Sequence, residues 1–453
     1  MAHGEIFILN YGYADFLKPC LKSVFENQIQ AHTFGVTVID NGSLKFNPWS
    51  LKRDFPELSI ISLKKNLGFS KGNNIGITNR LSEIIRNGEK YPDFIVLLNN
   101  DTLVDSRWFE TAAETLTNEP MCGICGSRTS FMDRFIVIDI HSPAYHPTEH
   151  GSNDIRRLGV FMSRIPDGNG VIDDQHRFKF EGCYEPQGDG RWLSPEARLF
   201  IPIIETAGYI KVHLTLENHN AGLNHLPVRI SSPDSGFPPL ETLIERDQPK
   251  TLKLNLDREN AKKILQNAGS VIYLDYSAGD RGFLEIDKGQ YSVMEDVDAV
   301  CGVSMFIKTE VWKMLGGFDE TYFSYYEDTD FCVRARLAGY RSLYQPLSQL
   351  THLHAGTSKE HSREFKQTVK NSKLVFQSKT MKPDHWKKTI SKIKIEGRNE
   401  FYYWIITRTL PEDSNLKTLV FYYKNYLRFK INRIRARLEA PWKTLSIRGD
   451  RVD

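Results

Sequence analysis

Short apolar runs separated by amphipathic stretches make up the first hundred residues of the chain. Four runs are typical of buried strands, namely EIFILN (5–10), VTVID (36–40), LSIIS (58–62) and FIVLL (94–98). Residues 14–27 and 75–87 repeat apolar side chains at three- and four-residue spacing, which predicts helices. Gly88 follows the second stretch, where a C-cap glycine is expected. Strands that alternate with helices predict a doubly wound α/β sheet.

The pattern changes near residue 133. Residues 133–275 alternate short β-like runs with clusters of Gly, Pro and Asp, which predicts an inserted all-β sandwich domain. The run AVCGVSMFI (299–307) then returns to the buried-strand pattern, and a helix follows it. The sequence therefore predicts an α/β domain formed by residues 1–132 and 276–358, an inserted domain at 133–275, and a helical C-terminal region at 359–453.

The C-terminal region differs in charge from the rest of the chain. Residues 359–453 contain 23 Lys and Arg against 10 Asp and Glu, a local balance of +13 within an overall net charge of +3. Leucine, isoleucine, valine and tyrosine recur at helical spacing from Leu416 to Leu438, which predicts an amphipathic helix with a basic polar face. Such a helix can lie on anionic lipid, or it can pack on its own domain and leave the basic face in water.

Composition places the chain among globular proteins, with 40% hydrophobic and 25% charged residues. No segment approaches the roughly 20 apolar residues of a membrane span, and the N-terminus lacks a signal-peptide pattern, so a cytoplasmic location is expected. No nucleic-acid partner is expected. Cys122 and Cys125 form a lone C-x-x-C without a second ligand pair, which favours buried free thiols over a zinc site.

Polar residues follow the apolar strand at 94–98 without a spacer. Asn99, Asn100 and Asp101 would lie at the carboxyl end of that strand, which is the edge where open α/β sheets bind ligands. A carboxylate between small polar side chains suits a hard cation, and the cation can hold phosphates. A simple turn after the strand is the alternative, because Asn and Asp favour turns.

Two further clusters lie at predicted strand ends or helix starts. Asn10 follows the first strand, and IDNGS (39–43) ends the second, where Asp40 can accept a hydrogen bond from a base or ribose or belong to an ordinary turn. In NLGFSKGNNIG (66–76) the glycines permit close backbone approach before a helix, which is a natural phosphate environment. No dinucleotide fingerprint and no P-loop motif is present.

Acidic residues and histidines form the last clusters. Glu327, Asp328 and Asp330 open a predicted helix, where the helix dipole stabilises negative charge. Capping accounts for one carboxylate, but three within four residues repel one another. Further on, THLHAGTS (351–358) carries His352 and His354, and either histidine can ligate a metal while the other packs.

Taken in order, these motifs resemble the rhamnosyltransferase-like members of glycosyltransferase family 2. The matching segments are LNY, IDNGS, NLGFSKGNNIGI, LLNND, GVSMFIKTEVWKMLGGFDETYFSYYEDTDFCVRARLAGY and HLHAGTS. The resemblance spans residues 5 to about 130 and about 279 to 358. It implies a GT-A fold, a nucleotide-diphosphate sugar donor, a Mg²⁺ or Mn²⁺ cofactor and inversion at the anomeric carbon.

The resemblance also assigns roles to residues of the nucleotide site. Asp40 would contact the nucleobase, and Asn10 and Asn73 would line the nucleotide pocket. Asn99 stands at the first position of the D-x-D motif of the family, which leaves a single charged residue on this strand and makes the cation harder to identify.

The remaining assignments concern the metal and the chemistry. Asp101 would be the metal-binding end of the D-x-D motif, completed by His354 or His352. Asp328 would be the general base, with Glu327 beside it in the E-D motif. The physical logic agrees, since inverting transfer needs a base for the acceptor hydroxyl and a cation for the departing phosphates.

These expectations describe an inverting transferase that adds sugar to a saccharide or lipid-linked acceptor during synthesis of a bacterial surface polysaccharide. A sugar nucleotidyltransferase is one rival, but it would need a Gly- and Arg-rich phosphate loop after the first strand, where ILNYGYADFLKP (8–19) has none. A noncatalytic carbohydrate-binding or scaffold protein is another, and the retention of Asp101, Asp328 and a late histidine argues against it.

Overall fold

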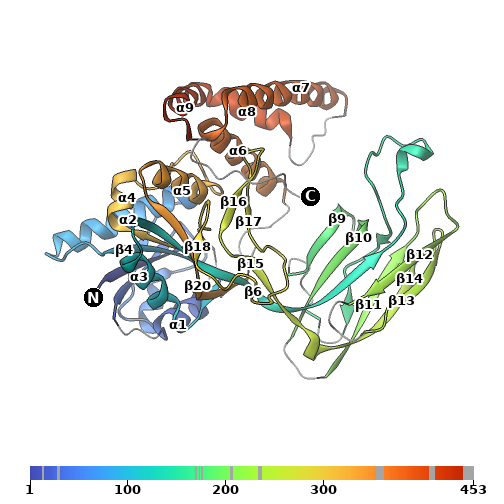
Figure 1. Cartoon of the computed structure of the whole chain (residues 1–453), viewed down its shortest axis with the longest axis horizontal. Helices are drawn as coiled ribbons and strands as arrows, with labels where there is room; N and C mark the ends of the chain where they lie inside the picture. Colours follow the sequence, from blue (N-terminus) through green and yellow to red (C-terminus); the bar gives the residue numbers. More distant parts are fainter. Residues whose placement is uncertain are drawn as a thin grey trace. The chain divides into compact units, whose positions relative to one another are not determined.

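The computed structural model describes residues 1–12, 15–27, 31–168, 171–172, 174, 177–204, 208–232, 237–353, 362–407 and 414–441 (Figure 1). The chain divides into two compact units, which we name unit 1 and unit 2. Unit 1 comprises Met1–Ser130, Gln266–Phe283 and Gly289–Asp453, and unit 2 comprises Phe131–Leu265 and Leu284–Lys288. Each unit has its own apolar core.

Unit 1 contains a mixed sheet that begins with four parallel strands. β3 (Ser59–Ser62) pairs with β2 (Thr33–Asp40), β2 with β1 (His3–Asn10), and β1 with β4 (Phe94–Asn99). The sheet continues through antiparallel pairs that involve β19 (Ser304–Lys308), β6 (Cys122–His141), β20 (Arg341–His352), β5 (Thr102–Val104) and β18 (Glu295–Asp296). The α/β sheet predicted from the apolar runs is confirmed, and its later strands are antiparallel.

Helices pack against both faces of this sheet. Ile6 and Ile8 belong to one apolar core with α1 (Leu17–Phe25) and α3 (Trp108–Asn118), whereas Phe7 belongs to a second core with α2 (Phe69–Arg86), α4 (Thr309–Leu315) and α5 (Glu327–Leu337). Alternate side chains of one strand point to opposite faces, so a strand buried on both faces must be apolar throughout. This explains the continuous apolar runs. A 3₁₀ turn, η1 (Pro48–Arg53), leads into β3.

The second predicted helix begins earlier than its apolar spacing indicated. α2 begins at Phe69, six residues before the predicted start, so most of the glycine- and asparagine-rich segment is helical. Its polar first turn carries no apolar periodicity, which is why the pattern missed it. At the other end the prediction is confirmed, since Gly88 has φ 79° and its amide donates to the Ile85 carbonyl.

The C-terminal helices form part of unit 1. They are α6 (Arg363–Thr380), α7 (Pro383–Thr407), α8 (Asn415–Lys424) and α9 (Tyr426–Glu439). The single amphipathic helix predicted for 416–438 is wrong, because the chain breaks at Asn425 into α8 and α9. Ile272, Tyr276, Tyr322 and Val333 share one apolar core with side chains of these helices. Within the described residues, no helix is long and apolar enough to cross a membrane.

Unit 2 is built from antiparallel strands around two clusters of buried apolar side chains. Its central strands pair in the order β13–β12–β6–β10–β9, and β11 pairs with β14. Their bounds are β7 (Phe161–Met162), β8 (Asp167–Gly168), β9 (Lys179–Gln187), β10 (Gly190–Ile203), β11 (Tyr209–Glu217), β12 (His225–Ser231), β13 (Leu240–Glu245), β14 (Lys250–Asp257) and β15 (Lys262–Asn267), with the 3₁₀ turns η2 (Pro147–His150) and η3 (Arg258–Asn260).

The bounds of unit 2 differ from those of the insert predicted at 133–275. β6 runs unbroken through residue 133, and Gln266–Phe283, which contains the hairpin of β16 (Ser270–Ile272) and β17 (Ala278–Asp280), belongs to unit 1. The domain division remains a prediction, and excision tests it. Replacing 133–263 by a short Gly/Ser linker is expected to leave unit 1 folded, with one cooperative thermal transition, because compact units hold their own cores.

A longer excision supplies the matched control. Replacing 133–275 also removes Ala268 and Ile272 from the core of unit 1, so its melting temperature is expected to fall by several degrees relative to the shorter excision. Circular dichroism during heating measures both variants. An unfolded 133–263 variant would show that unit 1 requires unit 2.

The two cysteines of the C-x-x-C motif are buried and free, as predicted. Burial raises the pKa of the Cys122 thiol to about 12 and the pKa of the Cys125 thiol well above its ordinary value. Thiols held protonated in this way are inert packing groups.

Candidate active site

Three predicted nucleotide-site residues lie at one edge of the parallel sheet. Asn10, Asp40 and Asn99 end β1, β2 and β4, and the register places Asn10 opposite Asp40 and Leu9 opposite Asn99. Asn100 donates from Nδ2 to Asn10 Oδ1 at 2.7 Å, while the buried Asn10 Nδ2 has no partner among the described residues. A buried amide donor left open at a ligand-binding edge fits an acceptor atom of a bound molecule.

Asp40 is buried and organises the turn after β2. Its Oδ1 accepts from the Ser43 amide at 3.2 Å, and its Oδ2 accepts from the Ser62 hydroxyl at 3.3 Å. Both distances lie at the long end of the hydrogen-bond range, and each carboxylate oxygen has a further lone pair. The carboxylate therefore serves the turn and retains capacity for a ligand.

Asn41, which the sequence analysis did not select, holds the loop before α2. Its Nδ2 donates to Asn66 Oδ1 at 3.0 Å and to the Gly68 carbonyl at 3.2 Å, and its Oδ1 accepts from the Leu67 amide at 3.0 Å. Gly68 has φ 82°, and a Cβ there would lie 2.3 Å from the Phe323 carbonyl oxygen. Only glycine fits this close approach of two backbones.

Asn73 lies inside α2 because the helix begins at Phe69. Its side chain is buried, and its Nδ2 donates to the Phe69 carbonyl at 3.0 Å. The amide thus stabilises the first turn of its own helix. The nucleotide contact expected for Asn73 remains a prediction.

Asp101 and His352 come together from distant parts of the chain. Asp101 Oδ1 lies 3.0 Å from His352 Nε2, and both side chains are buried. Gln266 Oε1 lies 2.9 Å from His352 Nδ1, and because that oxygen cannot donate, Nδ1 carries the hydrogen. Asn99 Nδ2 lies 3.4 Å from the same Nε2. Gln266 orients the ring and aims Nε2 at the carboxylate.

This pair fits a divalent cation. A neutral imidazole nitrogen and a carboxylate oxygen are both acceptors, so a proton or a cation has to lie between Nε2 and Oδ1. Asp101 and His352 would hold such a cation through one carboxylate oxygen and one imidazole nitrogen, both of which are ligand atoms for divalent metals. No cluster of three His, Cys, Asp or Glu side chains with metal-ligand geometry occurs among the described residues. His354 lies outside them.

Asp328 and Glu327 begin α5, and both carboxyl groups are held in an environment that disfavours charge. Asp328 Oδ2 accepts from the Gly302 amide at 2.8 Å, and its Oδ1 accepts from the Thr329 amide at 2.6 Å. Burial raises the pKa of Asp328 although these hydrogen bonds lower it. Burial, followed by the charge of Asp328, raises the pKa of Glu327 well above its ordinary value. Burial is the main cause of the raised pKa of Asp328.

The backbone immediately before these acids is strained. Tyr325 and Tyr326 have φ of 71° and 69°, in the left-handed region that bulky residues avoid. The rings pack against α6, with Tyr325 5.1 Å from Phe365 and Tyr326 5.5 Å from Phe376 between ring centroids. Such strain persists where the surroundings impose it, and it is found at functional sites.

Asp280 on β17 is a site residue that the sequence analysis missed. Asn267 Nδ2 donates to its Oδ1 at 2.6 Å, and the Ser270 hydroxyl donates at 3.2 Å. Burial raises the pKa of Asp280 to about 6, and the charges of Asp328 and His352 both reach it. Because Asn267 directly follows Gln266, whose side chain contacts His352, Asp280 lies close to the Asp101–His352 pair. No motif signalled it, because the residues before it were assigned to the insert.

An ionic network around the buried Asp330 holds the first turn of α5 in place. Lys379 of α6 contacts Asp330 Oδ1 at 2.7 Å and Asp319 Oδ2 at 2.8 Å, and Arg334 donates from Nε to Asp330 Oδ2 at 2.8 Å. Burial alone would raise the pKa of Asp330, but Lys379 and Arg334 outweigh burial and lower it. Of the three acids at this helix start, Asp330 thus has a structural role.

Comparison with known proteins gives the following relationships. The family model described as glycosyl transferase family 2 matches residues 5–165, and that described as glycosyltransferase-like family 2 matches residues 274–373. Among curated proteins no sequence matches the chain.

Several solved structures resemble the chain at low identity. GalNAc-T7 with UDP, GalNAc and Mn²⁺ is 9% identical with a TM-score of 0.44, and the match covers 98% of this chain and 58% of that one. The mannosyltransferase PcManGT from Pyrobaculum calidifontis, with GDP-Man and Mn²⁺, is 10% identical with a TM-score of 0.38 and coverages of 97% and 87%. S. aureus TarS with UDP is 12% identical with a TM-score of 0.36 and coverages of 83% and 65%. Similarities of this size assign no ligand to this chain.

Proposed function

The chain belongs to glycosyltransferase family 2, and on that premise we propose that it is an inverting enzyme that moves a hexosyl group from a nucleotide-diphosphate sugar to a saccharide or lipid-linked acceptor. One observation carries the proposal. Asp328 accepts from the Gly302 amide, and the next residue, Val303, accepts from the Asn99 amide. The Asn99 side chain lies 3.4 Å from His352 Nε2, so the Asp328 carboxylate lies near the buried Asp101–His352 pair. Inverting transfer requires such a base and such a cation site in one place.

Asp328 is the proposed general base. Its oxygens are fixed by the Gly302 and Thr329 amides, which orient the carboxylate while leaving lone pairs for an acceptor hydroxyl. Because burial raises its pKa, the ionised carboxylate is a stronger base than an exposed aspartate. Glu327, whose buried Oε2 has no partner among the described residues, adds to the negative potential when it is ionised.

Asp101 and His352 are the proposed holders of a Mg²⁺ or Mn²⁺ ion, with Gln266 orienting the imidazole. When bound, such an ion offsets the charge that develops on the departing nucleoside diphosphate. Asn10, Asp40 and Asn99 are proposed to bind the nucleotide at the same sheet edge. We further propose that the enzyme acts in the cytoplasm on a bacterial surface polysaccharide such as O-antigen or capsule, and that unit 2 is an accessory β-sandwich.

A donor screen tests this function. The full chain is incubated with UDP-, GDP- and dTDP-sugars and either Mg²⁺ or Mn²⁺, and release of nucleoside diphosphate and the shift in melting temperature are measured. We expect one nucleotide class to be hydrolysed slowly and to raise the melting temperature, since bound ligands stabilise the folded state. If no donor is hydrolysed or bound, the noncatalytic scaffold interpretation replaces this one.

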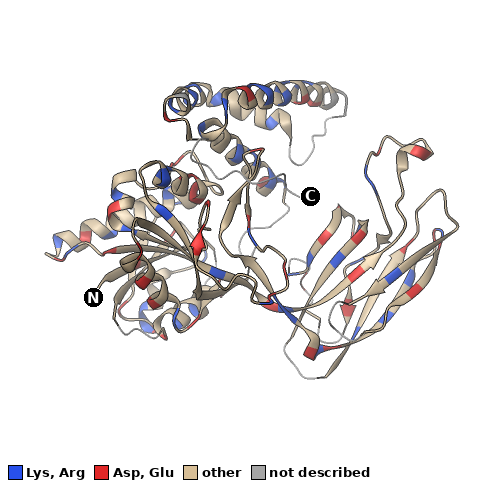
Figure 2. Ribbon diagram, in the orientation of Figure 1, with Lys and Arg blue, Asp and Glu red and all other residues tan. Residues whose placement is uncertain are grey.

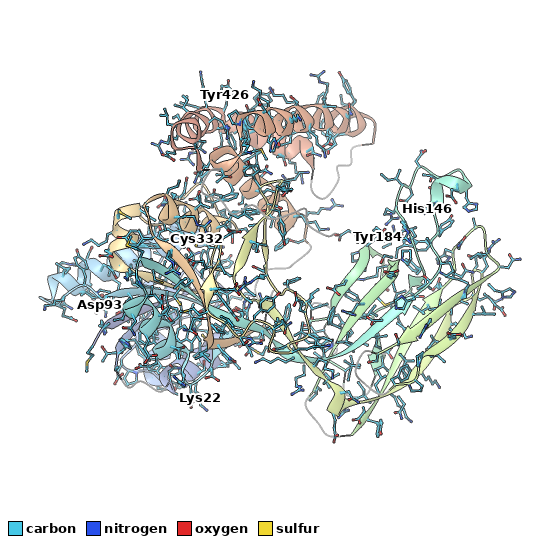
Figure 3. All side chains as sticks on the ribbon, in the orientation of Figure 1. Lys22, Asp93, His146, Tyr184, Cys332 and Tyr426 are labelled. Atoms are coloured by element: carbon cyan, nitrogen blue, oxygen red, sulfur yellow. The ribbon has the colours of Figure 1, made fainter. Side chains whose placement is uncertain are left out.

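We also propose that the C-terminal helices touch an anionic membrane surface. Leu427, Ile431, Ile434 and Leu438 of α9 are spaced so as to share one helix face, and they are 70%, 43%, 53% and 81% exposed. On the opposite face of α9, Phe429 and Ala436 are buried. An exposed apolar stripe bordered by cations suits the interface of a lipid layer. Figure 2 shows Lys and Arg along α6–α9, and Figure 3 labels Tyr426 at the start of α9.

Vesicle sedimentation tests this contact. The substitutions Leu427→Gln, Ile434→Gln and Leu438→Gln together are expected to weaken binding to phosphatidylserine vesicles at low salt by at least about tenfold, because apolar area is lost from the contact. Raising the salt concentration is expected to weaken binding of the unmodified protein.

The matched control replaces three apolar residues that are exposed elsewhere, Leu44, Ile155 and Val293, by glutamine. This control should bind vesicles normally, and both triple variants should keep the donor hydrolysis of the unmodified protein. Equal binding of the two variants, or no binding by the unmodified protein, would remove the membrane proposal.

A further inference from the structure

Unit 2 contains an open cleft of about 720 Å³ on the outer face of its sheet, which we name the outer cleft. The charged residues and the histidine of its lining are His141, Arg157, Glu196, Arg229 and Glu241. Small-molecule sites are typically concave spaces of about 300–1,000 Å³ with a few convergent polar groups. The outer cleft has this size and this kind of lining, and the transfer chemistry proposed above does not use it.

The strand register places four of these side chains in one row. Glu241 of β13 lies opposite Arg229 of β12, Arg229 lies opposite His141 of β6, and His141 lies opposite Glu196 of β10. The order of groups along the row is therefore carboxylate, guanidinium, imidazole, carboxylate. Among the described residues, no ion pair or hydrogen bond involves any of these four side chains, and all four residues are exposed.

Apolar side chains alternate with this row along the strands. Pro227 of β12 lies opposite Leu243 of β13, and both line the outer cleft together with Pro143 and Pro195. Leu243 is 54% exposed. The cleft thus combines flat apolar surface with a row of charged groups of both signs.

One wall of the outer cleft is held in place by contacts within unit 2. The hydroxyl of Tyr184, labelled in Figure 3, donates to the Arg157 carbonyl at 2.8 Å, and the Arg156 guanidinium lies 5.1 Å from the centroid of the Tyr184 ring. Ser142 also lines the cleft, and its buried Oγ has no partner among the described residues. A fixed wall reduces the ordering that a ligand would have to impose.

We propose that the outer cleft binds a neutral oligosaccharide. The identity of this ligand as an acceptor or product of the enzyme rests on the proposed function. The cleft lining holds two guanidinium groups and two carboxylates, which balance in charge, so an anion or a cation would meet like charge as well as opposite charge. Hydroxyl groups both donate and accept, and they match a lining that offers both donors and acceptors. The C–H faces of sugar rings match the proline and leucine surfaces. The ligand would be the acceptor or the growing product, held by unit 2.

Saturation-transfer NMR on the full chain tests this inference. The probes are neutral hexasaccharides of glucose, mannose, galactose and rhamnose, with hexagalacturonate as the anionic comparison. We expect at least one neutral probe to bind with millimolar or tighter affinity and hexagalacturonate to bind at least tenfold more weakly. The double variant Arg229→Ala/Glu241→Ala should bind the neutral probe at least tenfold more weakly than the unmodified protein.

The control is Lys253→Ala/Glu259→Ala, which changes two exposed charged residues of unit 2 outside the cleft. It should bind like the unmodified protein, and both variants should keep its melting temperature and donor hydrolysis. Absence of binding by every neutral probe, stronger binding of hexagalacturonate, or equal binding by the two variants overturns the inference. If the unmodified protein binds a neutral probe but hydrolyses no donor, that result contradicts the proposed function and not the inference about the outer cleft.

Discussion

Replacing Asp328 by asparagine is expected to lower kcat for sugar transfer by at least about a hundredfold, the scale of a lost general base. Asparagine keeps the size of the side chain and can still accept from the Gly302 or Thr329 amide, but it cannot take a proton from the acceptor hydroxyl. The melting temperature should change little, because the variant also removes a buried charge whose desolvation opposes folding. Steady-state transfer and thermal unfolding measure the two effects separately.

Asp330→Asn is the matched control on the same helix. Asp330 is buried between Lys379 and Arg334, so its replacement breaks a buried ion pair and is expected to cost on the order of 3 kcal/mol of folding free energy. Its effect on kcat should be far smaller than that of Asp328→Asn. If Asp328→Asn instead turned over normally and lost stability, Asp328 would be a helix cap and not the base.

The raised pKa of Asp328 also sets the sign of the pH dependence. The base works when ionised, so activity should be lost on acidification at a pH above the ordinary aspartate range. For stability the sign is opposite, since a folded-state pKa above the unfolded value means that the folded state binds more protons, and this group favours folding more at lower pH. Burial also raises the pKa of Asp280, to about 6, and the charges of Asp280 and Asp328 act on each other, so Asp280→Asn is expected to shift the acid limb.

The ligand-binding edge of the sheet could be predicted from the sequence because two general rules apply there and neither depends on tertiary contacts. Runs buried on both faces must be apolar, and ligand residues follow the carboxyl ends of parallel strands. Asn10, Asp40 and Asn99 obey both rules, and the register places them together. The same reasoning assigned Asn73 to a loop, because a polar first turn of a helix carries no apolar periodicity.

Gln266 and Asp280 escaped prediction for a different reason. β6 continues without a break from unit 1 into unit 2, and Gln266 lies in β15 at the return to unit 1, so hydropathy shows no boundary at either place. Both residues were hidden by assigning the preceding strands to one insert. Their roles depend on hydrogen bonds to His352, Asn267 and Ser270, and such contacts leave no local pattern.

The spacing of apolar residues also did not predict which face of α9 is buried. The apolar stripe from Leu427 to Leu438 predicts the packed face, yet the packed face contains Asn432 and Arg433. Arg433 donates to the Ser378 and Met381 carbonyls at the end of α6, and Asn432 donates to the Ser378 hydroxyl. Carbonyls at a helix end need donors, so a neighbouring helix can pack through polar groups and leave its apolar stripe exposed.

Removing the proposed metal ligands is expected to have the other large effect. Asp101→Ala and His352→Ala should each weaken Mn²⁺-dependent binding of UDP or GDP, whichever the unmodified protein binds, by at least about a hundredfold. Asp101 is the charged member of the pair, and a methyl group cannot replace a ligand oxygen when the cation gives up water. Gln266→Ala, which only frees the imidazole, should weaken Mn²⁺ binding by about 10- to 100-fold.

Asp105→Ala provides the control, since this exposed aspartate lies four residues further along the chain and, among the described residues, its side chain binds only the Arg107 amide. Calorimetric titration with Mn²⁺ and nucleotide, repeated in excess EDTA, measures every variant. Full transfer activity in EDTA would contradict a metal-dependent mechanism. Normal Mn²⁺-dependent binding by Asp101→Ala would place the cation elsewhere and leave the short contact between Asp101 and His352 as an ordinary ion pair, in which a proton occupies the position that we assign to the cation.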